Sequence, residues 1–274
     1  MATDRYAVIG HGIAYSRSPQ IHAWFAQACG QSLEYGLIDT PVEDFATRAR
    51  AFLAEGGLGL NVTVPFKQQA LALADVPSGR AQEAGAVNTL AVQRDGRVLG
   101  DNTDGAGLVR DLAANQRCEL AGARVLLLGA GGAARGVLGP LLRAGVARLA
   151  ISNRTAGRAV ELAQQFAPLG PVEALVAAPA APAGAAYDVI INATAASHQG
   201  ELPAMPAGAV GPGSLCYDMG YSLPDTVFQQ WARAAGARQV CNGLGMLVEQ
   251  AAESFLLWRG VRPETAPVLA RLRA

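Results

Sequence analysis

Residues 124–134 read RVLLLGAGGAA, and this stretch decides how the chain is expected to fold. Its first part, Arg124–Leu128, is a continuous apolar run of the kind found in a parallel strand that is buried on both faces. The glycine-rich turn 129–134 follows, then an expected helix to Arg143 and a second apolar strand, Ala147–Ser152. A strand, a glycine-rich turn, a helix and a strand within about 30 residues predict a dinucleotide-binding unit of the G-x-G-x-x-A type.

The glycine-rich turn has the residue types that a pyrophosphate site needs. Gly129 permits the tight turn, Gly131 lets the backbone approach the pyrophosphate, and Ala134 allows close helix–strand contact. Free N–H groups at the start of the helix are expected to face the phosphates. The predicted pyrophosphate contacts are Gly129, Ala130, Gly131, Gly132 and Ala133; the alternative is a glycine-rich turn that holds no ligand.

The end of the second strand distinguishes two nicotinamide dinucleotides. A carboxylate at this point binds a ribose 2′-hydroxyl, whereas an arginine accommodates a 2′-phosphate. The chain reads Ser152-Asn153-Arg154-Thr155, with Arg158 one turn later, and has no carboxylate there. Because guanidinium binds phosphate through two parallel hydrogen bonds, we expect NADP(H), held by Asn153, Arg154, Thr155 and Arg158. The alternative is an ordinary solvated start of a helix.

The rest of the chain also alternates between strands and helices. Strands are expected at 6–9, 33–38 and 58–62, a helix at 43–55, a hairpin at 86–93 and 97–100, later strands at 187–192 and 214–218, and an amphipathic helix at 245–258. Ser18-Pro19 predicts the start of a helix, with Ser18 as its cap, and Thr155 is expected to cap another. The predicted fold is α/β with two domains: an N-terminal mixed-sheet α/β domain and a Rossmann-like domain.

Composition excludes several classes of function. The 274 residues suffice for about two domains. The 22 basic and 22 acidic residues cancel, which gives no electrostatic footprint for nucleic acid or an anionic membrane. There is no apolar run long enough to span a membrane and no visible secretory signal, and the four cysteines follow no metal spacing. We therefore expect a cytoplasmic enzyme without a metal.

Lys67 is the one lysine among the 22 basic residues. An ammonium group can be tuned to give and take a proton, whereas a guanidinium stays protonated. Polar residues gather around it in the sequence, at 15–19, 61–67, 88–89 and 101–104. Hydroxyls, amides, one lysine and one aspartate suit a small polyhydroxylated substrate.

The segments that carry these residues resemble one enzyme family. They are YAVIG (6–10), SRSP (16–19), NVTVPFK (61–67), GAVNTL (85–90), GDNTDG (100–105), GAGGAARGV (129–137), NRT (153–155), INAT (191–194), YDM (217–219) and NGLGMLVEQAA (242–252). Together, from Tyr6 to Gly260, they resemble the shikimate dehydrogenases, NADP-dependent enzymes that reduce 3-dehydroshikimate to shikimate in aromatic amino acid (chorismate) biosynthesis.

The resemblance implies a substrate-binding domain at 1–104 and 242–274, a Rossmann-like NADP domain at 105–241, and an active site in the cleft. By matching position, the substrate carboxylate is expected at Ser16 and Ser18. Its hydroxyls or carboxylate are expected at Asn61, Thr63, Asn88, Asp104, Tyr217 and Gln250. Lys67 and Asp104 form the implied catalytic pair, and Thr194, Met219 and Gly243 border the nicotinamide or its ribose. The expected state is a monomer or homodimer.

The chain departs from the family pattern in two loops. In the first loop the usual Asn-Pro-Ile-x-His-Ser is HGIAYS at 11–16, so Gly12 replaces the proline and Tyr15 replaces the histidine. In the second loop the usual Asn-Ala-Thr-Ser-x-Gly is NATAAS at 192–197, so Ala195 replaces the serine and Ser197 replaces the glycine. These departures leave open a relative that acts on quinate or aminoshikimate. Two further alternatives are a folate-linked methylene dehydrogenase, disfavoured by the paired serines, and a non-catalytic sensor, disfavoured by the lysine–aspartate pair.

Overall fold

The computed structural model describes residues 3–176, 186–194, 196, 200–221 and 225–274. The chain forms two compact units, one of Met1–Gly107 with Val248–Ala274 (unit 1) and one of Leu108–Leu247 (unit 2). Both changes of unit fall inside helices, α5 (Asp104–Arg110) and α9 (Leu244–Arg259). The sequence placed them slightly earlier, after residues 104 and 241. The departures at Ala195 and Ser197 lie outside the described residues.

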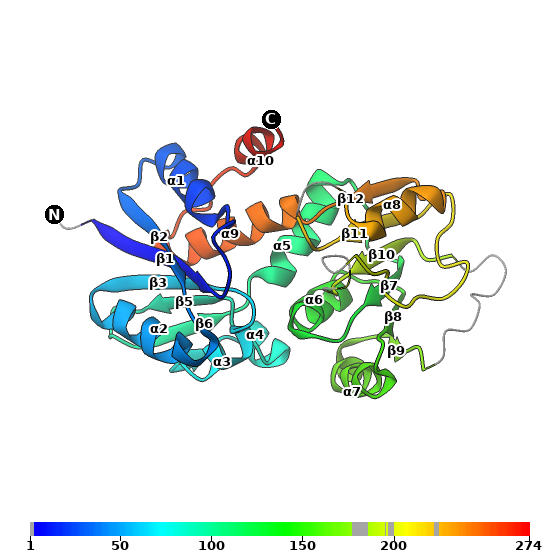
Figure 1. The fold of residues 1–274 in the computed structure, drawn as a ribbon, viewed down its shortest axis with the longest axis horizontal. Coiled ribbons are helices and arrows are strands. Elements are labelled where there is room, and N and C mark those ends of the chain that lie inside the picture. Colours follow the sequence, from blue (N-terminus) through cyan, green and yellow to red (C-terminus); the bar gives the residue numbers. More distant parts are fainter. Residues whose placement is uncertain (1–2, 177–185, 195, 197–199, 222–224) are drawn as a thin grey trace. The chain divides into compact units, whose positions relative to one another are not determined.

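Unit 1 is built on a mixed six-stranded sheet of order β2-β1-β3-β5-β6-β4. Its strands are β1 (Asp4–Gly10), β2 (Leu33–Asp39), β3 (Gly57–Val62), β4 (Val76–Pro77), β5 (Thr89–Val92) and β6 (Val98–Asp101). Its helices are α1 (Ser18–Ala28), η1 (Val42–Asp44), α2 (Phe45–Ala54), α3 (Lys67–Leu71), α4 (Gly79–Ala84) and α10 (Ala266–Arg273). Figure 1 shows α1 and α10 on one side of this sheet and α2 and α3 on the other.

The register of the unit 1 sheet places polar residues side by side. The predicted hairpin is confirmed: β5 and β6 pair antiparallel, with Thr89 opposite Asp101. On its other side, β5 pairs antiparallel with β3, and Thr89 lies opposite Asn61. Below this row the core is apolar; Phe45 and Phe66 stack with their ring centroids 4.5 Å apart. One cross-strand row therefore carries three polar side chains next to the segments that follow β3 and β6.

Unit 2 contains a parallel sheet of order β12-β11-β10-β7-β8-β9. Its strands are β7 (Arg124–Leu128), β8 (Arg148–Ser152), β9 (Val172–Ala174), β10 (Val189–Asn192), β11 (Leu215–Asp218) and β12 (Gln239–Cys241). Its helical segments are η2 (Asp111–Asn115, a π-helical turn), α6 (Gly132–Arg143), α7 (Ala156–Phe166), η3 (Ala167–Leu169) and α8 (Val227–Ala234). The chain order of these strands is 3-2-1-4-5-6 from the β9 edge, which is the Rossmann arrangement.

Strand β7 is buried on both faces, as its apolar run predicts. Val125 and Leu127 pack into one core with α6 and α7, whereas Leu126 and Leu128 pack into a second core with α8, and all four side chains have no exposed surface. Strand order reverses between β7 and β10. Ligands of open α/β sheets bind outside the carboxyl ends of the strands at such a switch point.

Of the two expected helix caps, Ser18 is wrong by one residue, and Thr155 is confirmed in position. Ser18 is the first residue of α1, and Arg17 holds the cap position without a side-chain hydrogen bond. Because the Ser16 hydroxyl accepts from the Ser18 backbone N–H at 3.3 Å, the preceding serine contacts the helix start instead. Thr155 does hold the cap position of α7, but its side chain makes no capping hydrogen bond. The expected helix 43–55 begins with η1, so α2 starts at Phe45, and the two-residue strand β4 was not expected.

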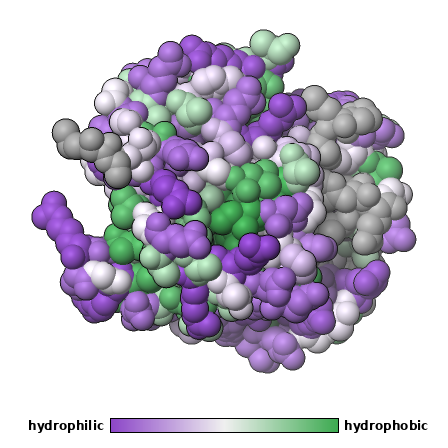
Figure 2. Space-filling view, turned by 60° about the vertical axis from the view of Figure 1, so that its left-hand side comes forward, coloured by the Kyte–Doolittle hydropathy of each residue, from purple (hydrophilic) through white to green (hydrophobic). Residues whose placement is uncertain are grey.

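One face of the molecule is predominantly polar where it is described (Figure 2). Figure 2 shows hydrophilic residues over much of one face, with a smaller area of hydrophobic residues among them. Large hydrophobic side chains that remain exposed include Tyr15 and Val64, at 69% and 68%. Within the described part of the chain, no helix has the length and apolar character needed to cross a membrane. The same residues contain no cluster of three or more His, Cys, Asp or Glu side chains suited to a metal ion.

Candidate active site

Lys67 and Asp104 form an ion pair at the edge of the unit 1 sheet. Lys67 begins α3, just after β3, and Asp104 begins α5, just after β6. The Lys67 Nζ lies 2.6 Å from Asp104 Oδ2, with side chains 21% and 6% exposed. The carboxylate is therefore nearly buried, while the ammonium retains access to a ligand.

Asn88 holds the other oxygen of the Asp104 carboxylate. Its Nδ2 donates to Asp104 Oδ1 at 2.9 Å. The Asn88 amide is in turn fixed by the backbone N–H of Thr103, which donates to Asn88 Oδ1 at 2.8 Å. The backbone N–H of Asp104 donates to the side chain of Asn102 at 3.2 Å. The GDNTDG and GAVNTL motifs thus meet in a network that fixes the direction in which Asp104 faces Lys67.

Gln250 and Asn61 belong to the same buried network. Gln250, on α9, accepts from Asn88 Nδ2 at 3.3 Å through its Oε1. A side chain on Gly107 would lie 2.7 Å from the Gln250 backbone, so glycine is needed where α5 passes α9. Asn61 Nδ2 donates to the hydroxyls of Thr89 and Ser254 at 3.1 and 2.9 Å. Five predicted site residues, Asn61, Lys67, Asn88, Asp104 and Gln250, are therefore brought together within unit 1.

The loop after β1 carries Ser16 and Ser18 and lies against the segment after β3. The backbone N–H of His11 donates to Val64 O at 3.1 Å, and that of Thr63 donates to Ile9 O at 3.0 Å. Ser18 is 7% exposed, and Ser16 and Thr63 are half-buried. These contacts place the paired serines on the same sheet edge as Thr63.

Tyr217 lies in the core of unit 2. Its side chain has no exposed surface, and its hydroxyl donates to Asp111 Oδ2 at 2.6 Å and accepts from the backbone N–H of Met246 at 3.3 Å. Burial raises the pKa of Tyr217 well above its usual value, and the adjacent Asp111 adds to this shift. The structure therefore uses this hydroxyl to hold the π-helical turn η2, whereas the other predicted substrate residues lie in unit 1. A substrate contact of Tyr217 stays a prediction.

The glycine-rich turn of unit 2 fits the pyrophosphate of a dinucleotide. Gly129 has a φ of +110°, which favours glycine, and a side chain on it would approach Thr194 Cγ2 to 3.0 Å. Side chains placed on Gly131 and Gly132 would meet nothing within 4 Å, so the backbone at the start of α6 borders open space. No side chain caps α6. Its first N–H groups are thus available to an anion, with the helix dipole favouring negative charge.

Two arginines follow β8 at the edge of this site. Arg154 and Arg158 are exposed, and neither guanidinium has a hydrogen-bond or ion-pair partner among the residues that the structure describes. The Asn153 side chain donates to Thr155 O at 2.9 Å and so shapes the turn that presents Arg154. Two available cations beside a dinucleotide turn fit the 2′-phosphate of NADP.

Thr194, Met219 and Gly243 meet at the carboxyl ends of the unit 2 strands. The Thr194 hydroxyl donates to Asn192 Oδ1 at 2.7 Å, and the Met219 backbone N–H donates to Asn192 O at 3.0 Å. A side chain on Gly243 would lie 2.1 Å from Met219 O, so the two backbones are in close contact. Thr194 also borders Gly129. The structure therefore joins these three residues to the dinucleotide turn.

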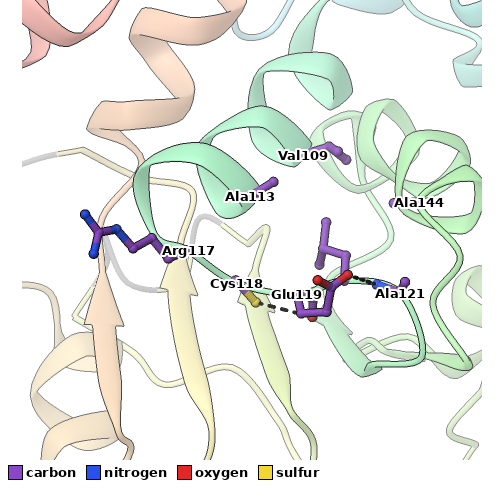
Figure 3. Close-up of a pocket in the computed structure, with 8 residues that line it drawn as sticks. Val109, Ala113, Arg117, Cys118, Glu119, Ala121 and Ala144 are labelled. Atoms are coloured by element: carbon purple, nitrogen blue, oxygen red, sulfur yellow. Dashed lines mark hydrogen bonds between the residues drawn. The ribbon is translucent and has the colours of Figure 1, made fainter.

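A separate open cavity of about 380 Å³ lies elsewhere in unit 2 (Figure 3). Its lining residues are Val109, Ala113, Arg117, Cys118, Glu119, Leu120, Ala121 and Ala144. Glu119 organises its rim: its carboxylate accepts from the Ala121 N–H at 3.3 Å, and its carbonyl accepts from the Cys118 thiol at 3.8 Å. None of the predicted site residues lines this cavity.

Sequence reasoning missed the residues that hold the site residues in place. Tyr35 and Ser254 bind the Asn61 amide, and neither lies in a segment selected for its polar residues. Thr89 and Thr103 bind Asn88 and do lie in the selected motifs. Their position beside Asn88 and Asp104 in the sequence could therefore have indicated their role. Ser254 offers no such signal, because it is one of several polar residues on an amphipathic helix and lies outside the selected segments.

Three protein-family models match the chain. They are described as shikimate dehydrogenase substrate binding domain (residues 8–90), shikimate / quinate 5-dehydrogenase (111–200) and shikimate 5′-dehydrogenase C-terminal domain (243–273). A shikimate dehydrogenase (NADP(+)) from Chromohalobacter salexigens is 55% identical over 100% of this chain and 99% of the relative.

Solved structures agree with these matches. An Ael1 enzyme from Pseudomonas putida superposes with a TM-score of 0.90 at 44% identity, covering 98% of each chain. A shikimate 5-dehydrogenase from Thermus thermophilus, in complex with NADP(H) and shikimate, superposes with a TM-score of 0.85 at 34% identity, covering 99% of each chain. These similarities extend over both units.

Proposed function

The chain belongs to the shikimate dehydrogenase family, and from that premise we propose that it catalyses the reversible NADP-dependent interconversion of 3-dehydroshikimate and shikimate. The observation that carries this proposal is the Lys67–Asp104 pair, 2.6 Å apart and oriented by Asn88. We place the substrate on unit 1 and the dinucleotide on the β7–α6 turn of unit 2. The matched relatives carry NADP in their names, which agrees with the two available arginines.

When bound, NADPH would supply the hydride that reduces the carbonyl carbon of the substrate, and the chain's own residues must protonate the oxygen. Lys67 donates that proton from Nζ to the developing alkoxide. Asp104 holds the ammonium in place, and Asn88 prevents the carboxylate from turning. The neutral amine regains a proton from solvent, to which the Lys67 side chain is 21% exposed. In the oxidative direction Lys67 accepts the hydroxyl proton.

The remaining site residues bind and orient the substrate. Ser16 and Ser18 are assigned to the carboxylate, because paired hydroxyl donors suit an anion. Thr63 and Gln250 are assigned to ring hydroxyls. We also propose that the protein is cytoplasmic and is a monomer or a homodimer.

The first experiment mixes purified protein with shikimate, quinate or aminoshikimate, each with NADP+ and with NAD+, and follows NADPH or NADH absorbance. We expect shikimate with NADP+ to give the highest kcat/KM. Faster turnover of quinate or aminoshikimate would move the assignment to that substrate, and binding of shikimate without any turnover would favour a sensor.

Lys67 variants test the proton transfer. We expect Lys67→Ala to lower kcat about 10²–10⁴-fold, the usual contribution of a general acid, with a smaller change in shikimate affinity. Lys67→Arg is the matched control, since it keeps the positive charge beside Asp104 but cannot release a proton. If Lys67→Arg retained most of the turnover, the residue would act through its charge alone.

Arg154→Ala tests the assignment of the 2′-phosphate. The change removes one bidentate phosphate contact, so we expect KM for NADP+ to rise at least tenfold while KM for NAD+ changes little. Arg50→Ala, at an exposed position on α2 in unit 1, is the control. Equal changes for both cofactors in Arg154→Ala would remove this residue from the site.

A further inference from the structure

The side-chain amide of Asn61 is held at both ends by the protein. Its Nδ2 has two hydrogens, which meet Ser254 Oγ at 2.9 Å and Thr89 Oγ1 at 3.1 Å. Its Oδ1 accepts from the Tyr35 hydroxyl at 2.7 Å. Asn61 is only 6% exposed. Its donors, which also meet Asn88 O at 3.4 Å, are therefore used within unit 1. Oδ1 has a second lone pair, which can accept one further hydrogen bond.

Tyr35 is suited to act as a permanent donor. Burial raises the pKa of Tyr35 well above its usual value, and the Ser18 side chain lowers it to a smaller extent. The phenol thus stays protonated at any working pH. Its ring stacks on His22, with centroids 4.2 Å apart and planes within 5° of parallel. Burial lowers the pKa of His22 to about 3, against a smaller opposing effect of the Asn61 side chain, so the stacked imidazole is neutral and adds no charge.

The position of Tyr35 connects two segments that the proposed function assigns to substrate binding. Tyr35 lies in the edge strand β2, and its side chain contacts His22 of α1, the helix that begins at Ser18, and Asn61 of β3. His22 follows Ser18 by one turn of α1 and fixes the phenol ring from that side. Ser254 fixes the Asn61 amide from α9 by accepting from Nδ2 while donating to Gln250 O at 3.1 Å. If the amide were reversed, Asn61 would lose the hydrogen bond from Tyr35 and its donation to Ser254.

We propose that Tyr35 is a positioning residue for substrate binding, which fixes the Asn61 amide so that Oδ1 accepts a hydrogen bond from a ring hydroxyl of the substrate. This inference rests on the proposed function and narrows it. An acceptor with no free donor repels a carboxylate, so Asn61 recognises a hydroxyl, and the carboxylate is left to the two serines. Tyr35 itself acts through Asn61.

Tyr35→Phe tests the proposal, with Tyr6→Phe as the matched control. Tyr6 is also a stacked tyrosine of unit 1, 4.7 Å from the Trp258 ring, and its hydroxyl accepts from Arg259 Nη1 at 3.3 Å, away from the substrate residues. We expect Tyr35→Phe to raise KM for shikimate about tenfold, the usual effect of losing one such hydrogen bond. The kcat and the KM for NADP+ should change less than about twofold, and the pH profile should keep its shape. Tyr6→Phe should leave all four unchanged, although both variants lower the melting temperature.

Substrate analogues locate the contact. Shikimate analogues that each lack one ring hydroxyl are compared as ligands of the wild-type protein and of Tyr35→Phe by calorimetry. We expect one analogue to bind the wild-type protein about tenfold more weakly than shikimate does and to lose most of that difference in Tyr35→Phe. An equal loss for every analogue in both proteins, or a KM for shikimate in Tyr35→Phe equal to that in Tyr6→Phe, would overturn the inference.

Two further measurements keep the test of Tyr35 decisive. If Tyr35→Phe does not yield folded protein, Ser254→Ala releases the same amide from its other end, and an unchanged KM for shikimate in that variant would overturn the inference. If the wild-type protein does not turn over shikimate, the proposed function fails. The analogue binding in the wild-type protein and in Tyr35→Phe still reports on Asn61 separately.

Discussion

His22 is a buried residue whose ring nitrogens lower the stability of the folded protein. It has no exposed surface, and neither ring nitrogen has a hydrogen-bond partner in the described part of the chain. A buried polar atom without a partner costs about 1–3 kcal/mol. Aromatic contacts offset part of this: the imidazole stacks on Tyr35 and meets Phe25 edge-on. Its contribution to the fold is therefore a flat, uncharged surface, which another ring can supply.

We predict that His22→Phe makes the protein less sensitive to acid. Burial lowers the folded-state pKa of His22 to about 3, from an ordinary 6.5. Between these values the unfolded chain binds a proton that the folded chain does not. Stability is therefore complete above pH 6.5 and falls as the pH drops, by about 1.4 kcal/mol per pH unit. His22→Phe removes this dependence, so its advantage over wild type should grow by about 2 kcal/mol between pH 7.5 and 5.0.

Urea unfolding of both proteins at the two pH values measures the difference. Near pH 7.5 the variant should be as stable as wild type or more stable, because it no longer buries the two ring nitrogens. A stability difference that does not change with pH would show that folding does not lower the pKa of His22.

At the scale of single residues, the sequence identified the proposed catalytic residues more readily than the residues that hold them in position. Lys67 was identified because a lone lysine in an arginine-rich chain is visible in the composition. Asp104 followed from its motif, and the structure pairs it with Lys67. Tyr35 and Ser254 were not identified, because their role depends on contacts across the fold: Asn61 and Ser254 are 193 residues apart in the chain. Side-chain direction and sheet register decide such contacts, and neither can be read from a segment by itself.

The loop between β1 and α1 differs from the family pattern for a visible backbone reason. Gly12 has a φ of +66° and donates its N–H to Asp39 Oδ1 at 2.8 Å. Proline, the usual family residue here, can neither adopt this φ nor donate. The backbone of Ile13 donates to the other Asp39 oxygen at 3.2 Å, and Ile13 O accepts from the Ser16 N–H at 2.8 Å. Asp39 therefore anchors the loop that carries the proposed carboxylate-binding serines.

We predict that Gly12→Ala lowers the free energy of unfolding by about 1–2 kcal/mol, because a side chain makes the left-handed conformation costly. Gly12→Pro should cost more, since the hydrogen bond to Asp39 is also lost, and should raise KM for shikimate by displacing Ser16. Gly157→Ala is the control: this α7 glycine has an ordinary φ and open space around it, so alanine should be neutral or stabilising there. Denaturant unfolding and shikimate kinetics measure both effects. A family-like Gly12→Pro variant with unchanged stability and KM would show that the loop tolerates either backbone.

Whole elements were predictable where one physical requirement dominates. The run Arg124–Leu128 was predictable as a central strand, because it is short, ends at a glycine-rich turn and places consecutive apolar side chains on both faces. The antiparallel hairpin of β5 and β6 followed from its turn. Strand β4 is two residues long and pairs with β6 at the edge of the sheet, and no local pattern indicates so short an element. The Ser18 cap was wrong by one residue: Ser18 is already the first helical residue, and its N–H donates to the Ser16 hydroxyl.

For the whole molecule, the two units have separate cores, and the proposed ligands divide between them. The apolar cluster around Phe45 and Phe66 lies entirely in unit 1, and the clusters on the two faces of β7 lie entirely in unit 2. Units with separate cores can open separately. A ligand that binds one folded unit stabilises it by mass action, by about 2.7 kcal/mol at a concentration of 100 Kd.

We therefore predict that the two ligands protect different parts of the chain from hydrogen exchange. NADP+ alone should slow exchange in unit 2, above all at the β7–α6 turn and after β8, by up to about 100-fold at 100 Kd. Shikimate alone should slow exchange in unit 1, around β3, β5 and the start of α5. The strands β1 and β2 serve as internal controls for NADP+, and β10 and β11 for shikimate. If either ligand protected both units equally, the molecule would open as one cooperative body, and the separate cores would not be separate units of stability.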